Sequence, residues 1–209
     1  MALASKAKYA TLLVAVALCI GGYATRQTWL RLGAESLVCA AAEAPSDAVL
    51  IDNVEYKYVL FERAQRLKAR GLASTVLVPI LGPVSDSEPN DVSLGFVDVM
   101  CRIARVSDCI TFHVPSVEPI SLNLARSTAQ ELNARGIRSV LLVTDGFRSR
   151  RAFDVYAAVL GPLGITVRCQ PVFGSHTPLN WSESSHGVEE VGLQFIKLWY
   201  YRVIVMRGQ

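Results

Sequence analysis

Three arginine residues stand close together, two positions after the tripeptide Thr-Asp-Gly. They are Arg148, Arg150 and Arg151. A helix N-terminus carries about +0.5 of a charge, so cations are disfavoured there by about 0.3–1 kcal/mol each. Guanidinium groups and unpaired backbone N–H groups together form a binding site for phosphate and other anions. We therefore predict an anion site here. The alternative is a solvated turn in which Asp145 pairs with Arg148 and Asp154 pairs with Arg150.

The residues around these arginines predict how they are positioned. Residues 139–143, Ser-Val-Leu-Leu-Val, have the mostly branched, apolar character of a strand buried on both faces. Apolar residues recur at helical spacing from Phe147 to Leu160. Thr144, Asp145 and Gly146 separate the two patterns, and Asp145 is placed to cap the helix by accepting its first N–H groups.

The same strand–helix pattern recurs along most of the chain. The expected strands are residues 48–51, 76–78, 110–114, 139–143 and 165–169. Helical patterns occupy residues 60–71, 94–104, 119–132 and 147–160, and an amphipathic helix follows at 188–199. This alternation predicts an α/β fold: a doubly wound, Rossmann-like, mostly parallel five-stranded sheet with helices on both faces.

Ligands of such folds bind outside the carboxyl ends of the strands. This rule and the residue chemistry select the following candidate ligand-binding residues: Asp52, Asn53, Glu118, Asn123, Arg126, Thr144, Asp145, Gly146, Arg148, Arg151 and Trp181. The loop 82–91 belongs to the same edge, and the polar loop 174–185 is long enough to act as a lid. Two simpler interpretations remain: a capped helix with a surface Arg126, and a Trp181 that only anchors its loop.

Catalytic signatures are absent from the sequence. It contains no G-x-S-x-G, Walker A, H-E-x-x-H or G-x-G-x-x-G motif. The spacing of His176, Glu183 and His186 matches no familiar zinc pattern, so we expect no metal site. The sequence assigns no catalytic residue and no cofactor, and whether the protein is an enzyme stays open.

Residues 9–25 contain no charged side chain and are flanked by lysine and arginine residues. Their length is at the lower limit for a membrane-spanning helix, which predicts a retained anchor; a cleaved signal peptide is the alternative. The expected organisation is a membrane anchor at 1–25, a linker or juxtamembrane stalk at 26–46, the α/β domain at 47–205 and a tail at 206–209. The flanking charges favour a single-pass protein of the inner (cytoplasmic) membrane, with its domain on the periplasmic side.

The composition also limits the classes of molecule that the protein is expected to bind. The net charge of +3 is too small for a nucleic-acid-binding protein, and basic and aromatic residues are not interleaved. Five cysteines are scattered without a C-x-x-C pair, and they are interpreted mostly as buried apolar residues. One pair could form a disulfide if the domain lies outside the cytoplasm.

Several segments together resemble the YdcF/SanA-like family, a family defined by a domain of unknown function. The resemblance covers residues 47–201 and rests on four segments: 47–50, 118–125, 143–152 (Val-Thr-Asp-Gly-Phe-Arg-Ser-Arg-Arg-Ala, the most specific) and 180–182. It implies a Rossmann-like sheet, often behind one N-terminal membrane helix, and a link to the bacterial envelope and exported polysaccharides. One member of that family is associated with S-adenosylmethionine.

The chain departs from the family pattern at three positions. Glycine pairs common after the first two strands are replaced here by residues 51–53 and 79–83, and Arg148 stands where a histidine is common. These changes favour a binding site over an active enzyme. We therefore expect a membrane-anchored envelope protein that binds an anionic small molecule or lipid-linked saccharide. The alternatives are a nucleotide- or S-adenosylmethionine-binding enzyme and a non-catalytic scaffold of an envelope assembly complex.

Overall fold

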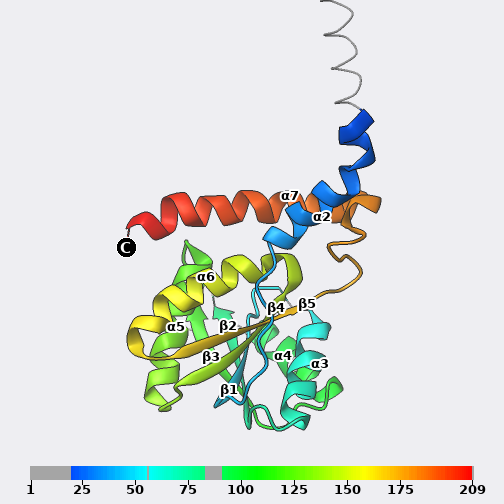
Figure 1. Cartoon of the computed structure of the whole chain (residues 1–209). Helices are drawn as coiled ribbons and strands as arrows, with labels where there is room; N and C mark the ends of the chain where they lie inside the picture. Colours follow the sequence, from blue (N-terminus) through cyan, green and yellow to red (C-terminus); the bar gives the residue numbers. More distant parts are fainter. Residues whose placement is uncertain (1–19, 56, 83–90, 209) are drawn as a thin grey trace, which may run out of the picture.

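A computed structural model describes residues 20–55, 57–82 and 91–208 (Figure 1). Its centre is a five-stranded sheet in the order β3-β2-β1-β4-β5, with every neighbouring pair parallel. The strands are β1 (Ala48–Ile51), β2 (Thr75–Gly82), β3 (Cys109–Pro115), β4 (Ser139–Asp145) and β5 (Thr166–Val172). The predicted five-stranded parallel α/β fold is thus confirmed. Strand β2 is longer than the expected 76–78.

Both faces of the sheet are covered because successive strand residues point to opposite sides. Val49 and Ile51 pack with α3 (Tyr58–Ala69) and α4 (Asp91–Ile103). Leu50, on the other face, packs with α5 (Ile120–Ala134) and α6 (Ser149–Leu160). All four residues of β1 are buried, as expected for a central strand between two helical layers.

The connection between β4 and α6 differs from the expected direct entry into a helix. Gly146–Arg148 form a single 3₁₀ turn, η1, and the α-helix begins only at Ser149. A Cβ atom on Gly146 would lie 2.2 Å from a ring carbon of Phe173, so a side chain at this position would clash. Gly146 therefore permits close packing between this turn and the end of β5.

A third layer lies at the carboxyl ends of β4 and β5. Helix α7 (Ser185–Tyr200) continues into the π-helical turn η4 (Tyr201–Val205) and the 3₁₀ turn η5 (Met206–Gly208). Helix α2 (Arg26–Ser36) lies beside α7 (Figure 1), and Ala34 packs in one cluster with Phe147, Val191 and Leu198. Residues 26–46, the expected linker or stalk, thus begin with a helix that packs on the domain.

Two disulfides are formed, one of them between distant parts of the chain, so most of the cysteines are not the free apolar residues expected from the sequence. Cys39 is bonded to Cys169 on β5, and Cys101 is bonded to Cys109. Beside the first disulfide, the backbone N–H of Ala42 donates to the Cys169 carbonyl at 3.0 Å. The segment after α2 is therefore fixed along β5.

Most of the predicted membrane anchor, and loop residues 83–90, lie outside the described residues. Within the described residues, no helix is both long and apolar enough to cross a bilayer.

Candidate functional site

Asp52, Thr144 and Arg148 meet at the carboxyl edge of the sheet, as their strand positions predict. Asp52 directly follows β1, and its Oδ2 accepts a hydrogen bond from Thr144 Oγ1 of neighbouring β4 at 2.9 Å. The Arg148 Nε lies 3.0 Å from the same carboxylate oxygen. All three side chains are buried. Because a buried charge needs a partner of opposite sign, Asp52 and Arg148 balance each other.

Arg151 lies beside this pair but has different partners. Its Nη1 donates to Ser121 Oγ at 3.0 Å, and its Nη2 donates to Gln194 Oε1 at 3.0 Å. The guanidinium carbon lies 5.2 Å from the centre of the Tyr201 ring, within the range of a cation–π contact. Arg151 is only 6% exposed, and its Nε has no hydrogen-bond partner among the described residues.

The two arginines and one aspartate leave this cluster with an excess positive charge. Burial, and to a smaller extent the neighbouring Arg148, lower the pKa of Arg151 to about 10. Arg151 still carries its charge at neutral pH. Ser121 Oγ accepts from Arg151 and, at 3.5 Å, from Arg148 Nη2. A hydroxyl that accepts from two cations keeps its own hydrogen for an acceptor.

The N-terminal end of α5 borders this cluster, and two of the predicted residues, Glu118 and Asn123, lie at or just before it. The exposed Glu118 carboxylate accepts from the Ile120 N–H at 3.1 Å, and the Tyr201 hydroxyl accepts from the Ser121 N–H at 3.0 Å. Asn123 Nδ2 donates to the Val117 carbonyl at 3.0 Å. Glu118 therefore occupies a helix N-terminus, a position that also suits a ligand anion.

The structure places three other predicted residues away from the arginines. Asn53 is buried and donates to the Pro79 carbonyl at 3.2 Å. Arg126 is exposed and lines a groove between α5 and α6 together with Val159. The Trp181 indole donates to the Leu30 carbonyl of α2 at 3.2 Å and packs in the α2–α7 cluster. The structure thus matches the anchoring alternative for Trp181.

The two ion pairs of the solvated-turn alternative, Asp145–Arg148 and Asp154–Arg150, are not formed. Asp145 occupies the position before η1, but its side chain makes no capping hydrogen bond. Its Oδ1 lies 3.0 Å from Lys57 Nζ instead. Asp154 pairs with Arg202, near the C-terminus, at 2.6 Å. The solvated-turn alternative is therefore wrong in its pairs, and the expected cap by Asp145 is wrong as well.

A second polar group surrounds His176, and sequence reasoning did not identify its partners. Its Nε2 lies 2.9 Å from Ser184 Oγ, and its Nδ1 lies 3.2 Å from Glu190 Oε2. Glu190 Oε1 lies 3.6 Å from Lys57 Nζ, which links the group to Asp145. A cavity of about 160 Å³ is bordered by these charged side chains and by Phe147 and Phe173.

Burial and neighbouring charges act in opposite directions on the pKa values of Asp145 and Lys57. Burial raises the pKa of Asp145 more than the adjacent Lys57 ammonium lowers it. Burial alone would lower the pKa of Lys57, but the carboxylates of Asp145, Glu55 and Glu190 outweigh it and raise this pKa. The lysine therefore stays charged at the wall of the cavity, facing a partly desolvated carboxylate.

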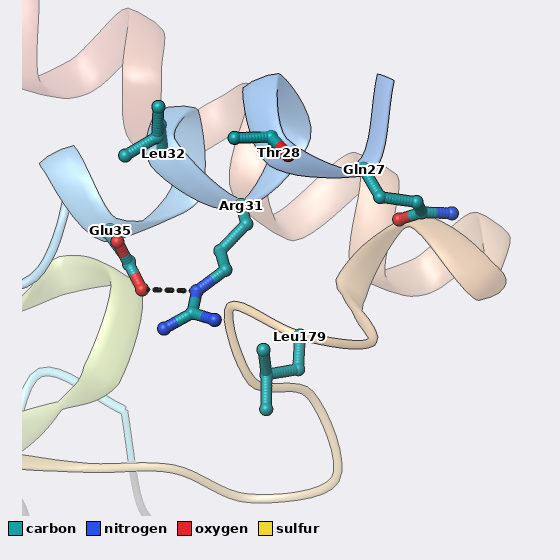
Figure 2. Close-up of a pocket in the computed structure, with 6 residues that line it drawn as sticks. All are labelled: Gln27, Thr28, Arg31, Leu32, Glu35 and Leu179. Atoms are coloured by element: carbon teal, nitrogen blue, oxygen red, sulfur yellow. Dashed lines mark hydrogen bonds and ion pairs between the residues drawn. The ribbon is translucent and has the colours of Figure 1, made fainter. Parts of the chain in front are cut away.

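The predicted lid, residues 174–185, is held by several hydrogen bonds. Asn180 Oδ1 accepts from the Thr177 N–H at 2.7 Å, and Asn180 Nδ2 donates to the Ser175 carbonyl at 3.1 Å. Ser184 caps α7 by accepting from the Gly187 N–H at 3.0 Å. On α2, Arg31 extends toward Leu179 of this loop and pairs with Glu35 at 2.7 Å (Figure 2).

Three members of the arginine cluster were not predicted: Ser121, Gln194 and Tyr201. Only Ser121 had a detectable signal, because it lies in the same segment as Glu118 and Asn123. Gln194 and Tyr201 belong to the C-terminal helical region and reach the cluster only through the tertiary packing of α7 and η4. Among the described residues, no three His, Cys, Asp or Glu side chains are grouped to hold a metal ion.

No protein-family model, curated protein or solved structure matches this chain. The resemblance to the YdcF/SanA-like family therefore stays a prediction from the motifs.

Proposed function

We propose that this protein binds an anionic ligand, bearing a phosphate or carboxylate group, at the carboxyl edge of its sheet. The observation that carries the proposal is Arg151, a buried cation whose side-chain hydrogen-bond partners among the described residues, Ser121 and Gln194, are neutral. Burying a charge without an opposite charge is costly. A bound anion supplies the missing charge and accepts charge-assisted hydrogen bonds.

The arrangement suits a small oxyanion. Arg148 is oriented by Asp52, and Arg151 is oriented by Gln194, so both guanidinium planes are fixed before a ligand arrives. Fixed guanidinium groups bind phosphate and carboxylate with little loss of side-chain entropy. The Ser121 hydroxyl, between the two arginines, adds a neutral donor.

We propose that this anion binding takes place in the cell envelope, in a protein that is anchored by its N-terminal segment and has its domain outside the cytoplasm. Two disulfides support that side of the membrane, because disulfides persist in oxidising compartments. Phosphorylated or lipid-linked saccharides are the ligands that this location and the family resemblance favour.

Titration of the full chain in detergent micelles tests the proposal. Inorganic phosphate and a sugar phosphate should raise the melting temperature, because a ligand stabilises the state that binds it. Arg151→Gln should weaken phosphate binding at least about tenfold, which corresponds to 1.4 kcal/mol. Arg150→Gln is the matched control: Arg150 lies on the same helix, outside the buried arginine cluster.

Two results would reject the anion site. One is an Arg151→Gln protein that binds phosphate as tightly as wild type. The other is a wild-type protein whose melting temperature no phosphate or carboxylate changes. A shift with nucleotides or S-adenosylmethionine, but not with inorganic phosphate, would favour the cofactor-binding alternative.

A second candidate function, acyl-group hydrolysis, is favoured by the contacts that His176 makes with Ser184 and Glu190. A histidine between a hydroxyl and a carboxylate is the arrangement that activates a serine nucleophile. In this reaction, Ser184 Oγ attacks an ester carbonyl while its proton passes to His176 Nε2 and then to the leaving alcohol. Water hydrolyses the acyl-enzyme and restores the serine. Covalent labelling by a fluorophosphonate tests this candidate.

A further inference from the structure

Helix α7 is apolar on the side that faces away from the protein. Its inner side is buried and includes Val191, Gln194 and Leu198. Residues on the opposite side are spaced by three or four positions and are large, apolar and exposed. This outer face of α7 consists of Leu193, Ile196, Trp199 and Tyr200 on the helix itself and of Val203 on the continuing turn η4. Ile196 is 70% exposed and Trp199 is 58% exposed.

A surface helix of a soluble protein normally carries polar residues on its outer side. Here the outer face extends over nearly three helical turns and continues to the exposed Ile204. Contiguous exposed apolar patches of this kind mark an interaction surface. Figure 1 shows α7 at the margin of the molecule, on the opposite side from β1 and α3.

Helix α2 contributes exposed apolar residues beside α7. Trp29 is 67% exposed and Leu32 is 51% exposed, while Ala34 packs with Val191 and Leu198 of α7. The uncharged run 9–25 leads directly into α2 in the sequence. Helix α2, which follows this run in the sequence, lies beside α7 (Figure 1).

The charges of the C-terminal region have one sign. The charged residues after Glu190 are Lys197, Arg202 and Arg207. Arg202 pairs with Asp154, so the net positive charge of this region comes from Lys197 and Arg207. Aromatic and aliphatic side chains combined with basic residues are typical of helices that lie in the interface of an anionic bilayer. A second copy of the chain would instead bring these like charges together.

We propose that the outer face of α7 docks on the surface of an anionic lipid bilayer, with the helix axis parallel to the membrane plane. Ile196, Trp199 and Val203 enter the boundary between headgroups and acyl chains. This docking is independent of the anion site and fixes the orientation of the domain: its carboxyl edge, beneath α7, faces the membrane. The anionic ligand site then lies within reach of a membrane-bound substrate.

Tryptophan fluorescence of the full chain in vesicles of phosphatidylcholine and phosphatidylglycerol tests the docking. The Trp199 signal is the difference between wild type and Trp199→Phe. Lipids brominated near the headgroup end of the acyl chain should quench about half or more of this signal, because interfacial helices insert about 5–10 Å. The Trp181 signal, obtained with Trp181→Phe, should be quenched much less, since its indole is bonded to the Leu30 carbonyl.

Ile196→Asp should abolish most of the Trp199 quenching while leaving the fold intact, because Ile196 is already exposed. Val92→Asp places the same charge on an equally exposed site of α4 and should leave the quenching of Trp199 unchanged. A Trp199 that emits as in water and is unquenched would overturn the proposal. So would a blue-shifted, unquenched Trp199 with crosslinks between chains, which would assign the outer face to a second copy.

Discussion

Arg148 and Arg151 lie three residues apart on the chain, yet their surroundings differ in charge. Arg148 is neutralised by Asp52 at 3.0 Å, whereas Arg151 contacts neutral groups and an aromatic ring. Removing Arg148 would leave the buried Asp52 carboxylate unpaired, at a cost of about 3–5 kcal/mol.

The pKa of Arg151 gives a prediction at the residue scale. Because this pKa is lowered to about 10, the group that attracts the anion loses its charge well below the usual range of arginine. Sulfate affinity should be level between about pH 7 and pH 9 and should fall as the pH rises through about 10. Sulfate is the suitable probe because its own charge is constant there, and isothermal titration calorimetry measures the affinity.

Arg151→Lys sharpens this test. A buried lysine has a lower pKa than a buried arginine, so the fall in sulfate affinity should move to lower pH. If sulfate affinity in wild type is unchanged well above pH 10, Arg151 does not supply the charge that binds the anion.

The loop before α7 and the first turn of that helix form one structural unit. Ser184 caps the helix and contacts His176, while Gly187 allows the chain to fold back closely. A Cβ atom on Gly187 would lie 2.1 Å from the Trp181 carbonyl oxygen. In this unit the imidazole of His176 contacts the Ser184 hydroxyl through Nε2 and the Glu190 carboxylate through Nδ1.

This unit gives a prediction that distinguishes two roles of Ser184, that of a helix cap alone and that of a nucleophile. A fluorophosphonate should attach to Ser184 in wild type, as located by mass spectrometry of the labelled peptide. His176→Gln should slow labelling at least about a hundredfold, within the range that general base catalysis contributes. Ser182→Ala, on the same loop, is the control and should label normally.

Labelling of Ser184 at equal rates in wild type and His176→Gln would show that the histidine does not activate it. The absence of any label at Ser184 in the wild type would leave the hydroxyl as a helix cap. Either result would remove the hydrolase candidate and leave the anion site untouched.

At the scale of the whole molecule, the Cys39–Cys169 disulfide joins the segment after α2 to β5. The two cysteines are 130 residues apart, and closing so long a loop restricts the unfolded chain strongly. It thereby helps to keep α2, α7 and the carboxyl edge of the sheet in one arrangement. The Cys101–Cys109 disulfide closes a loop between residues only eight positions apart, so it restricts the unfolded chain less.

Removing the long-range disulfide should destabilise the protein measurably. Cys39→Ala should lower the free energy of unfolding by about 2–5 kcal/mol in urea titrations under oxidising conditions. Cys101→Ala should cost less, because its loop is shorter. A reductant should bring wild type down to the level of Cys39→Ala combined with Cys101→Ala. If a reductant has no effect on wild type, the disulfides are not formed in solution.

The sequence determined the sheet, its parallel strands and the edge at which polar residues gather. Strand and helix periodicities are local, and one topological rule places the carboxyl ends of parallel strands together. Asp52, Thr144 and Arg148 were therefore identified correctly as neighbours. Arg151 was identified as part of the same cluster for the same reason.

Only the tertiary structure decided which charges are balanced and what covers the site. Gln194 and Tyr201 reach Arg151 because α7 and η4 pack over it, and no local sequence pattern predicts that contact. The pairing of Asp145 with Lys57, and not with Arg148, likewise depends on the position of the loop after β1. Coulomb energies depend on distance and burial, and both are properties of the folded chain alone.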